Sequence, residues 1–218
     1  MRFEVKGNPS YGEVDVDLGP NETLLIEPGA MSRMSSNLNS SFQRQGGFFS
    51  AMFRKMFGGE SFFLGKYEHP DGGKLTFAPA SPGSVQHYKL SNNNINIMAG
   101  AFLACTPEVN VKAKFGGFKA LFSGEGAFLL EVSGNGDLFF NSFGGIVEKE
   151  INGDFIVDTG HVVAFEPSLN YKISGMGNWK STMLSGEGLV MTFSGVGKIY
   201  LQTRTIDGIA SWLTPRLI

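Results

Sequence analysis

A short motif occurs three times in the sequence, and this repetition limits the possible folds more than any other feature. Each copy places a glycine and a glutamate ahead of an apolar run, and the glutamates are Glu60, Glu125 and Glu187. Their spacings of 65 and 62 residues are nearly equal. A motif that returns at a near-constant interval marks an internal repeat, in which every copy forms one structural unit. We therefore expect three similar units in one chain.

Two further features recur in the same order around this motif. Upstream, an alternating segment ends at a glycine, and the residues five and three positions before that glycine are apolar, as in a half-buried strand. These glycines are Gly29, Gly100 and Gly160, and we expect them to occupy equivalent turns. Downstream, a glycine opens a second apolar run. The predicted units are about 1–80, 81–142 and 143–204, related by a pseudo-threefold axis, with a tail at 205–218.

Composition indicates that these units are all β. Glycine accounts for 30 of the 218 residues, about twice its average usage, and phenylalanine for 20. Glycine-rich turns between aromatic and β-branched runs are typical of strands, and we expect turns at 78–83 and 92–94. A unit of about 60 residues would be marginally stable alone, so the three units are expected to share a core as a single domain.

Two segments have helical patterns. Residues 48–57 place their large apolar side chains on one helical face, whereas Arg54 and Lys55 turn away from it. A shorter helix is predicted at 207–213, with Asp207 as its N-cap and Pro215 ending it. The apolar face of the first helix consists of Phe48, Phe49, Met52, Phe53, Met56 and Phe57.

The helix at 48–57 is the predicted interaction surface. Burying one large apolar side chain is worth roughly 1.5–3 kcal/mol, so this face must cover its own β body, a partner or a membrane surface. Covering the open end of the body is the favoured interpretation. We nevertheless expect part of the face, chiefly Phe49 with Met52 or Phe53, to make a homo-oligomeric contact. Membrane association is the weaker alternative, to which Arg54 and Lys55 are suited.

Three carboxylates alternate with apolar residues in the strand predicted at 13–18. Glu13, Asp15 and Asp17 would share one face of that strand, where they could hold a divalent cation. The favoured interpretation is a solvated edge strand whose charges discourage further pairing.

The repeated glutamates also allow two interpretations. If they converge on one axis, Glu60, Glu125 and Glu187 would bind a cation or raise one another's pKa. The favoured alternative is structural, with each carboxylate accepting backbone N–H bonds inside its own glycine-rich corner. His161 stands where the other units have alanine, and we interpret it as a structural or surface histidine in preference to a functional one. No metal or other cofactor is predicted.

Charge and motif content exclude several functional classes. The net charge of −2 gives no basic surface for nucleic acid. Nucleophile elbows, phosphate loops and zinc-binding motifs are absent from the sequence, so we assign no catalytic residue. The one cysteine, Cys105, corresponds to Met34 and Phe165 in the other units, which indicates a buried small hydrophobe. The charged, alternating start and the lack of an apolar stretch of about 20 residues predict a soluble cytoplasmic protein, with peripheral membrane attachment left open.

Taken together, these motifs resemble the family that includes the yeast altered-inheritance-of-mitochondria, or mitochondrial biogenesis, protein. The resemblance implies a fold like that of the tryptophan-RNA-binding attenuation protein: a short double-stranded β-helix, here triplicated. It implies no catalytic residues, because the bacterial members are mostly uncharacterised, and the mitochondrial members are linked to inner-membrane organisation. RNA binding does not follow from the fold. The motifs that carry the resemblance are 26–31, 58–63, 157–166, 185–188 and 202–204.

The leading functional hypothesis is a non-catalytic scaffold or interaction protein that assembles with its own copies through an apolar helix. The alternative is a small-ligand or metal-binding module with a pocket between repeats. An enzyme of unrecognised type is the third hypothesis.

Overall fold

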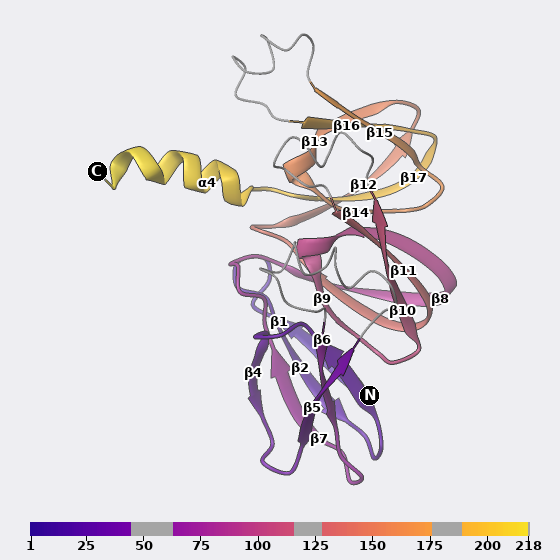
Figure 1. Ribbon diagram of the computed structural model, residues 1–218, viewed down its shortest axis with the longest axis vertical. Helices are drawn as coiled ribbons and strands as arrows, with labels where there is room; N and C mark the ends of the chain where they lie inside the picture. Colours follow the sequence, from indigo (N-terminus) through magenta and orange to yellow (C-terminus); the bar gives the residue numbers. More distant parts are fainter. Residues whose placement is uncertain (45–62, 116–127, 176–188, 218) are drawn as a thin grey trace.

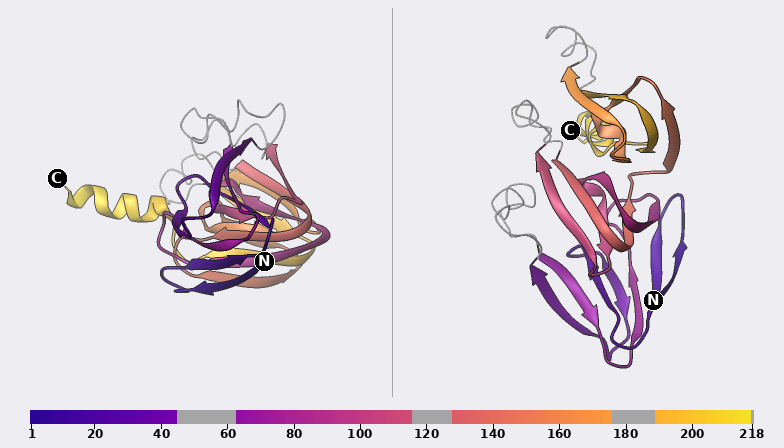
Figure 2. Two further views of the ribbon diagram at one scale, coloured as in Figure 1. Left: turned by 90° about the horizontal axis from the view of Figure 1, so that it is seen from below. Right: turned by 90° about the vertical axis from the view of Figure 1, so that its right-hand side faces the viewer.

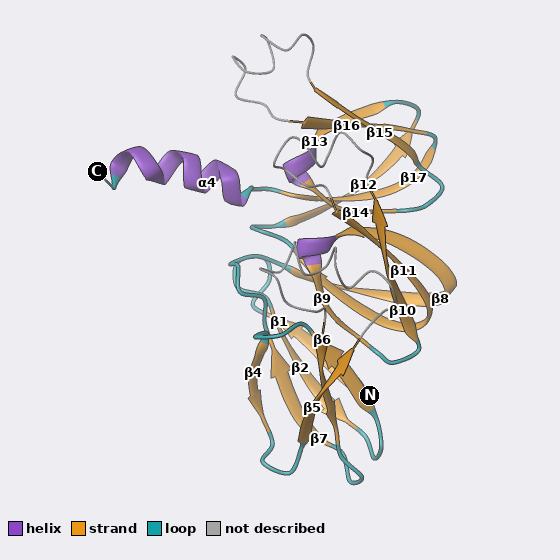
Figure 3. Ribbon diagram, viewed as in Figure 1, coloured by secondary structure: helices purple, strands orange, loops and turns teal. Residues whose placement is uncertain are grey.

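Within the residues that the structure describes, the protein is a β structure with one short α-helix near the end of the chain. The computed structural model describes residues 1–44, 63–115, 128–175 and 189–217. Its strands form antiparallel sheets that follow one another along the long axis, and helix α4 (Ile206–Leu213) leaves the side of this body (Figure 1, Figure 3). The prediction of an all-β body is confirmed at this level.

The sheet at the N-terminal end has four strands, in the order β1-β2-β7-β4. The predicted strand at 13–18 is confirmed as β2 (Glu13–Leu18). It lies between β1 (Arg2–Lys6) and β7 (Gly73–Phe77), so the interpretation of 13–18 as an edge strand is wrong. Cations from two other strands of this sheet, Lys6 of β1 and Arg33 of β4, bind its carboxylates. The fourth strand is β4 (Met31–Met34).

We call the segments 1–80, 81–142 and 143–204 the thirds of the chain. A ten-stranded sheet joins the successive thirds, and a three-stranded sheet completes the last third. Figure 2 shows the thirds stacked, from indigo through magenta to orange. The three-stranded sheet contains β13 (Phe155–Asp158), β16 (Leu189–Ser194) and β15 (Asn170–Gly175). The large sheet contains β3 (Thr23–Ile26), β5 (Asn39–Arg44), β6 (Phe63–Glu68), β8 (Val85–Met98), β9 (Phe102–Cys105), β10 (Val109–Phe115), β11 (Phe128–Asn141), β12 (Ile146–Asn152), β14 (Val162–Phe165) and β17 (Val196–Gln202).

The turn predicted at 92–94 is wrong, because β8 continues through these residues. Asn92 takes a φ of 57°, and the pairing of β8 with β11 shifts register between Gly134 and Asn135. Gly134 has a φ of 122°. Asparagine and glycine tolerate positive φ, so the chain forms a bulge that bends the strand pair without reversing it.

Among the described residues, the core consists of three apolar clusters, and each cluster draws residues from more than one third of the chain. They centre on residues such as Phe77, Phe140 and Phe193, all of which are fully buried. Cys105 is fully buried in the middle cluster, as predicted, and burial raises the pKa of its thiol to about 12. It therefore packs as a small apolar side chain and has no thiolate for chemistry near neutral pH.

A hydrogen-bonded turn of the same kind occurs in each third of the chain. A polar side chain accepts the backbone N–H of a residue on the last strand of that third, and its own carbonyl accepts the N–H of the residue three positions later. The side-chain bonds join Ser35 with Lys74 (2.9 Å), Thr106 with Asp137 (3.1 Å) and Glu166 with Lys198 (2.9 Å). The carbonyl bonds come from Leu38, Val109 and Leu169 at 3.1–3.2 Å.

The glycines expected at equivalent turns precede strands with matching partners. Gly29, Gly100 and Gly160 come two residues before the first paired residues of β4, β9 and β14. Each of these strands pairs with the last strand of its third, and each pairing contains a register shift. The turns differ in detail: Gly29 has a φ of 86°, whereas the others lie in the 3-10 turns η1 (Ala99–Ala101) and η2 (Thr159–His161).

Candidate interaction surface

The links between successive thirds of the chain lie side by side. Residues 82–84 lead into β8, 142–145 lead into β12, and 203–205 lead into α4. The first two links are joined by bonds from the Ser84 N–H to the Gly144 carbonyl (2.9 Å) and from the Ser142 N–H to the Ser84 carbonyl (3.0 Å). The Thr203 N–H donates to the Gly145 carbonyl (3.0 Å), which adds the third link. The three links therefore form one hydrogen-bonded junction.

Glycine is favoured where these links pack closely against one another. A Cβ on Gly83 would lie 1.9 Å from the Ser142 carbonyl oxygen. Gly144 has a φ of 74°, and a Cβ there would lie 2.6 Å from Thr203 Oγ1. The backbone around Gly83 leaves no room for a side chain, and the positive φ of Gly144 disfavours one, so glycine suits both positions.

The loop between β1 and β2 is tied to the same junction. The Asn8 side-chain amide donates to the Val85 carbonyl and accepts the Val85 N–H, each at 2.9 Å. The Gly12 N–H donates to the Gly83 carbonyl at 2.7 Å. The intervening Tyr11 points outward and is 76% exposed.

The three links and the β1-β2 loop border a shallow cavity of about 500 Å³, which we call the junction groove. Most of its lining is apolar side chain or backbone, and Arg204 is its only charged lining residue among those described. The groove is lined by Pro9, Ser10, Tyr11, Pro82, Phe143, Gly144, Gly145, Thr203 and Arg204.

Helix α4 begins two residues beyond Arg204 and projects from the body (Figure 1). Its N-cap is Thr205, whose hydroxyl accepts the Gly208 N–H at 3.0 Å, so the prediction of Asp207 as N-cap is wrong by two residues. Asp207 lies in the first turn, where its charge suits the helix dipole. Pro215 lies in the 3-10 turn η3 (Thr214–Arg216), which follows α4 directly.

We call residues 206–217 the C-terminal arm, and every one of them is exposed. Ile206, Ile209 and Leu213 follow the i, i+3, i+7 spacing of an apolar helical face. Trp212 borders this face with 60% of its surface exposed, and the Arg216 guanidinium lies over its ring at 4.4 Å. The arm has the sequence pattern of a helix that packs against something, yet the described part of its own chain leaves it uncovered.

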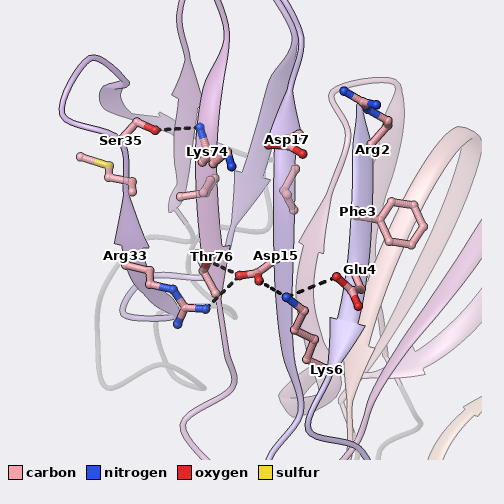
Figure 4. A pocket seen from close by; sticks show the side chains of 13 residues that line it. Arg2, Phe3, Glu4, Lys6, Asp15, Asp17, Arg33, Ser35, Lys74 and Thr76 are labelled. Carbon is pink, nitrogen blue, oxygen red and sulfur yellow. Dashed lines mark hydrogen bonds and ion pairs between the residues drawn. The ribbon is translucent and has the colours of Figure 1, made fainter.

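A second cavity, of about 600 Å³, lies on the outer face of the β1-β2-β7-β4 sheet (Figure 4). Arg33 donates to both carboxylate oxygens of Glu13 (3.0 and 2.8 Å) and to Asp15 (2.9 Å). Lys6 and Thr76 donate to Asp15 at 2.7 and 2.6 Å. These two bonds hold the pKa of Asp15 at about 2, below its ordinary value of 3.8. The carboxylates of Glu13 and Asp15 therefore already have cationic partners, which disfavours the cation-site interpretation of 13–18.

Two other titratable groups stand outside this face. His161 Nδ1 lies 2.7 Å from the Gln202 carbonyl, so the ring donates this bond, and the Gln202 side chain accepts the Phe143 N–H at 2.8 Å. His161 thus adjoins the junction through Gln202. Glu27, at the end of β3, has no hydrogen-bonded side-chain partner among the described residues, and burial raises its pKa from 4.5 to about 7. No described cluster of three or more His, Cys, Asp or Glu side chains is arranged to hold a metal ion.

The other predicted site residues lie outside the described residues. They fall in the connections from β5 to β6, β10 to β11 and β15 to β16. The predicted interaction helix and both interpretations of the three glutamates therefore stay predictions. The residues concerned are Phe48, Phe49, Met52, Phe53, Arg54, Lys55, Met56, Glu60, Glu125 and Glu187. None of the described helices has the length and apolar character needed to cross a membrane.

Sequence reasoning missed the junction groove but located part of the arm. The groove residues come from separate links, and no local pattern marks Tyr11 and Phe143 as neighbours. The spacing of Ile206, Ile209 and Leu213 was the available signal for an apolar helical face, whereas the short helix was predicted from its end signals, Asp207 and Pro215, alone.

Comparisons with known proteins agree over nearly the whole chain. A family model described as mitochondrial biogenesis AIM24 matches residues 3–204. The uncharacterized protein M6_Spy0233 of Streptococcus pyogenes serotype M6 is 31% identical over 222 residues, covering 98% of this chain and 90% of that protein. The crystal structure of protein SPYM3_0169 from Streptococcus pyogenes is similar, with a TM-score of 0.82, 29% identity and 99% coverage of both chains. The resemblance predicted from the motifs is confirmed.

Proposed function

The chain belongs to the mitochondrial biogenesis AIM24 family, and from that premise we propose that it is a non-catalytic interaction protein that assembles with copies of itself. The observation that carries this proposal is the C-terminal arm, an amphipathic helix whose residues are all exposed. We propose that it acts in the cytoplasm, as expected from the sequence.

We also propose that the body is a triplicated β unit of the double-stranded β-helix type. Its support is the recurrence of one pairing scheme. In the first third, β2 and β4 pair with β7 while β3 and β5 pair with β6. In the last third, β12 and β14 pair with β17 while β13 and β15 pair with β16. In the middle third, β8 and β11 each run through two of these positions. A rigid repeated body of this kind suits a scaffold, because it holds its arm at a fixed place.

The exposed arm is energetically unfavourable in an isolated monomer. Ile206, Ile209, Trp212, Leu213 and Leu217 are each between 40% and 73% exposed. Complete burial of such a side chain is worth roughly 1.5–3 kcal/mol, and a contiguous exposed apolar patch marks an interaction site. Covering this face supplies a driving force for association that the described body leaves unused.

Charge favours a protein surface over a lipid surface as the arm's target. Within the arm, Asp207 and Arg216 cancel, so it lacks the basic polar face that attracts interfacial helices to anionic lipid. Membrane association through residues 48–57, with Arg54 and Lys55, is kept as the weaker alternative contact.

A comparison of two arm variants tests this function. We expect light scattering coupled to gel filtration to give an oligomer for the wild type at concentrations on the order of tens of micromolar. Ile209→Ser with Leu213→Ser should reduce the mass to that of one chain while the far-UV spectrum stays β-rich. Ser211→Ala, on the polar face of the same helix, is the matched control and should leave the mass unchanged. A wild-type protein that is monomeric throughout this concentration range would refute self-assembly.

A further inference from the structure

We propose that the junction groove is the docking site for the C-terminal arm of a second copy of this chain, and that the two copies exchange arms reciprocally. This inference rests on the proposed self-assembly and assigns both of its contact surfaces. In this proposal, the junction of the three links has a binding role in addition to its structural role.

The arm and the groove are adjacent along the chain but are not placed to fill each other within one molecule. Arg204 lines the groove, and α4 starts two residues later. The helix then runs away from the body, as both views show (Figure 1, Figure 2). A twofold axis beside the root of the arm solves this geometry, because it brings each arm back across the partner's groove. Such an isologous contact closes after two copies, which is the commonest form of protein assembly.

The two surfaces match in chemistry. The groove is bordered by Tyr11, Phe143 and two prolines, and its volume of about 500 Å³ falls within the range that buries ligands of several side chains in size. The arm presents Trp212 beside Ile209 and Leu213. Tyr11 and Trp212 are the most suitable pair, since both are largely exposed aromatic side chains and aromatic residues dominate the energetics of protein interfaces.

A second copy fits better than a lipid surface or a nucleic acid. The arm has no net side-chain charge, and the groove carries only Arg204 among its described lining residues, so neither surface is built to attract a polyanion. Recognition must therefore come from shape and apolar burial. The arm from 206 to 216 is about 15 Å long at 1.5 Å per residue, which is sufficient to reach across an adjoining surface. Every copy carries both halves of the contact, so one species suffices.

Disulfide trapping between two different single-site variants tests the inference. Tyr11→Cys and Trp212→Cys proteins of distinguishable mass are mixed and mildly oxidised, and the buried Cys105 stays unreactive in both. We expect a mixed dimer linked between positions 11 and 212. Asp71→Cys, at the exposed tip of the β6-β7 hairpin, replaces Tyr11→Cys as the matched control and should give no mixed dimer with Trp212→Cys.

A second variant keeps the inference separable from the proposed function. Tyr11→Glu should weaken assembly about tenfold or more without changing the melting temperature of the dilute, unassembled chain, because Tyr11 is an exposed loop residue. If the protein assembles through its arm but no 11–212 link forms and Tyr11→Glu has no effect, the groove assignment is wrong while self-assembly stands. If the wild type is monomeric, both fail.

Discussion

The Asn8 side-chain amide forms a two-bond contact with the backbone of Val85, 77 positions away, with both bonds at 2.9 Å. The amide completes the strand-like hydrogen bonding at the start of β8 and holds the β1-β2 loop on the junction. Because this loop carries Tyr11, the contact positions one wall of the groove.

Replacing Asn8 should therefore destabilise the junction. Asn8→Ala leaves the Val85 N–H and carbonyl without partners, which costs about 1–3 kcal/mol and lowers the melting temperature by roughly 2–4 °C per kcal/mol. Thermal unfolding measures the change. Ser10→Ala, in the same loop but exposed, should be nearly neutral. Equal stability of the Asn8 variant and the wild type would mean that the contact holds nothing in place.

Glu27 should make stability fall as pH rises toward 7. Its folded pKa of about 7 lies above the ordinary 4.5, so between these values the folded state binds more protons than the unfolded state. The cost of the buried charge is absent below pH 4.5 and complete above pH 7. Glu27→Gln should raise the melting temperature by roughly 3–6 °C at pH 8 and by nothing at pH 4. A variant whose advantage is constant across this range would contradict the assigned cause.

Asp15 should have the opposite pH dependence. Its folded pKa of about 2 lies below the ordinary 3.8, so its contribution is present above pH 4 and is lost as pH falls through 2. Asp15→Asn should lower the melting temperature by roughly 1–3 °C at pH 7, since exposed pairs are screened, and by less in high salt. The measurement is a thermal melt at pH 7 and at pH 2. A difference that persists at pH 2 would show that packing and not charge is responsible.

The local parts of the structure were predictable because they follow from periodicity. Alternation of valine and acid in 13–18 predicted β2 with its observed bounds, and the repeat position of Cys105 predicted its burial. The cations that bind the carboxylates of β2 lie elsewhere in the chain. Arg33 and Lys6 are 18 and 9 residues from Asp15, and no pattern within the strand predicts that they bind it.

Contacts between distant segments explain the remaining misses. The junction groove depends on links such as 82–84 and 142–145 lying side by side, which sequence spacing does not state. At the start of the arm, Thr205 and Asp207 are both residue types that favour the N-cap position, and which of them caps the helix depends on where β17 ends. At Asn92 the chain forms a bulge and not a turn, because Asn92 takes a positive φ and is left unpaired between the Gly134–Asn93 and Asn135–Ser91 pairs of β11 and β8.

Cys105 should be chemically silent in the folded protein. Burial raises its pKa to about 12, so at pH 8 only about one thiol in ten thousand is a thiolate, and reagent cannot reach it. A colorimetric thiol assay should detect no cysteine in the native protein and one per chain in guanidinium. Rapid reaction without denaturant would mean that the middle core cluster opens readily.

The most direct measurement of arm burial is the fluorescence of Trp212 as the protein is diluted. The chain has two tryptophans, and Trp179→Phe leaves Trp212 as the sole reporter. If assembly covers the arm, emission should be blue-shifted at concentrations on the order of tens of micromolar and move to the red on dilution, in step with the fall in mass. Emission that stays at the position of exposed tryptophan at every concentration, while the mass shows an oligomer, would contradict the proposal that the arm is the assembling surface.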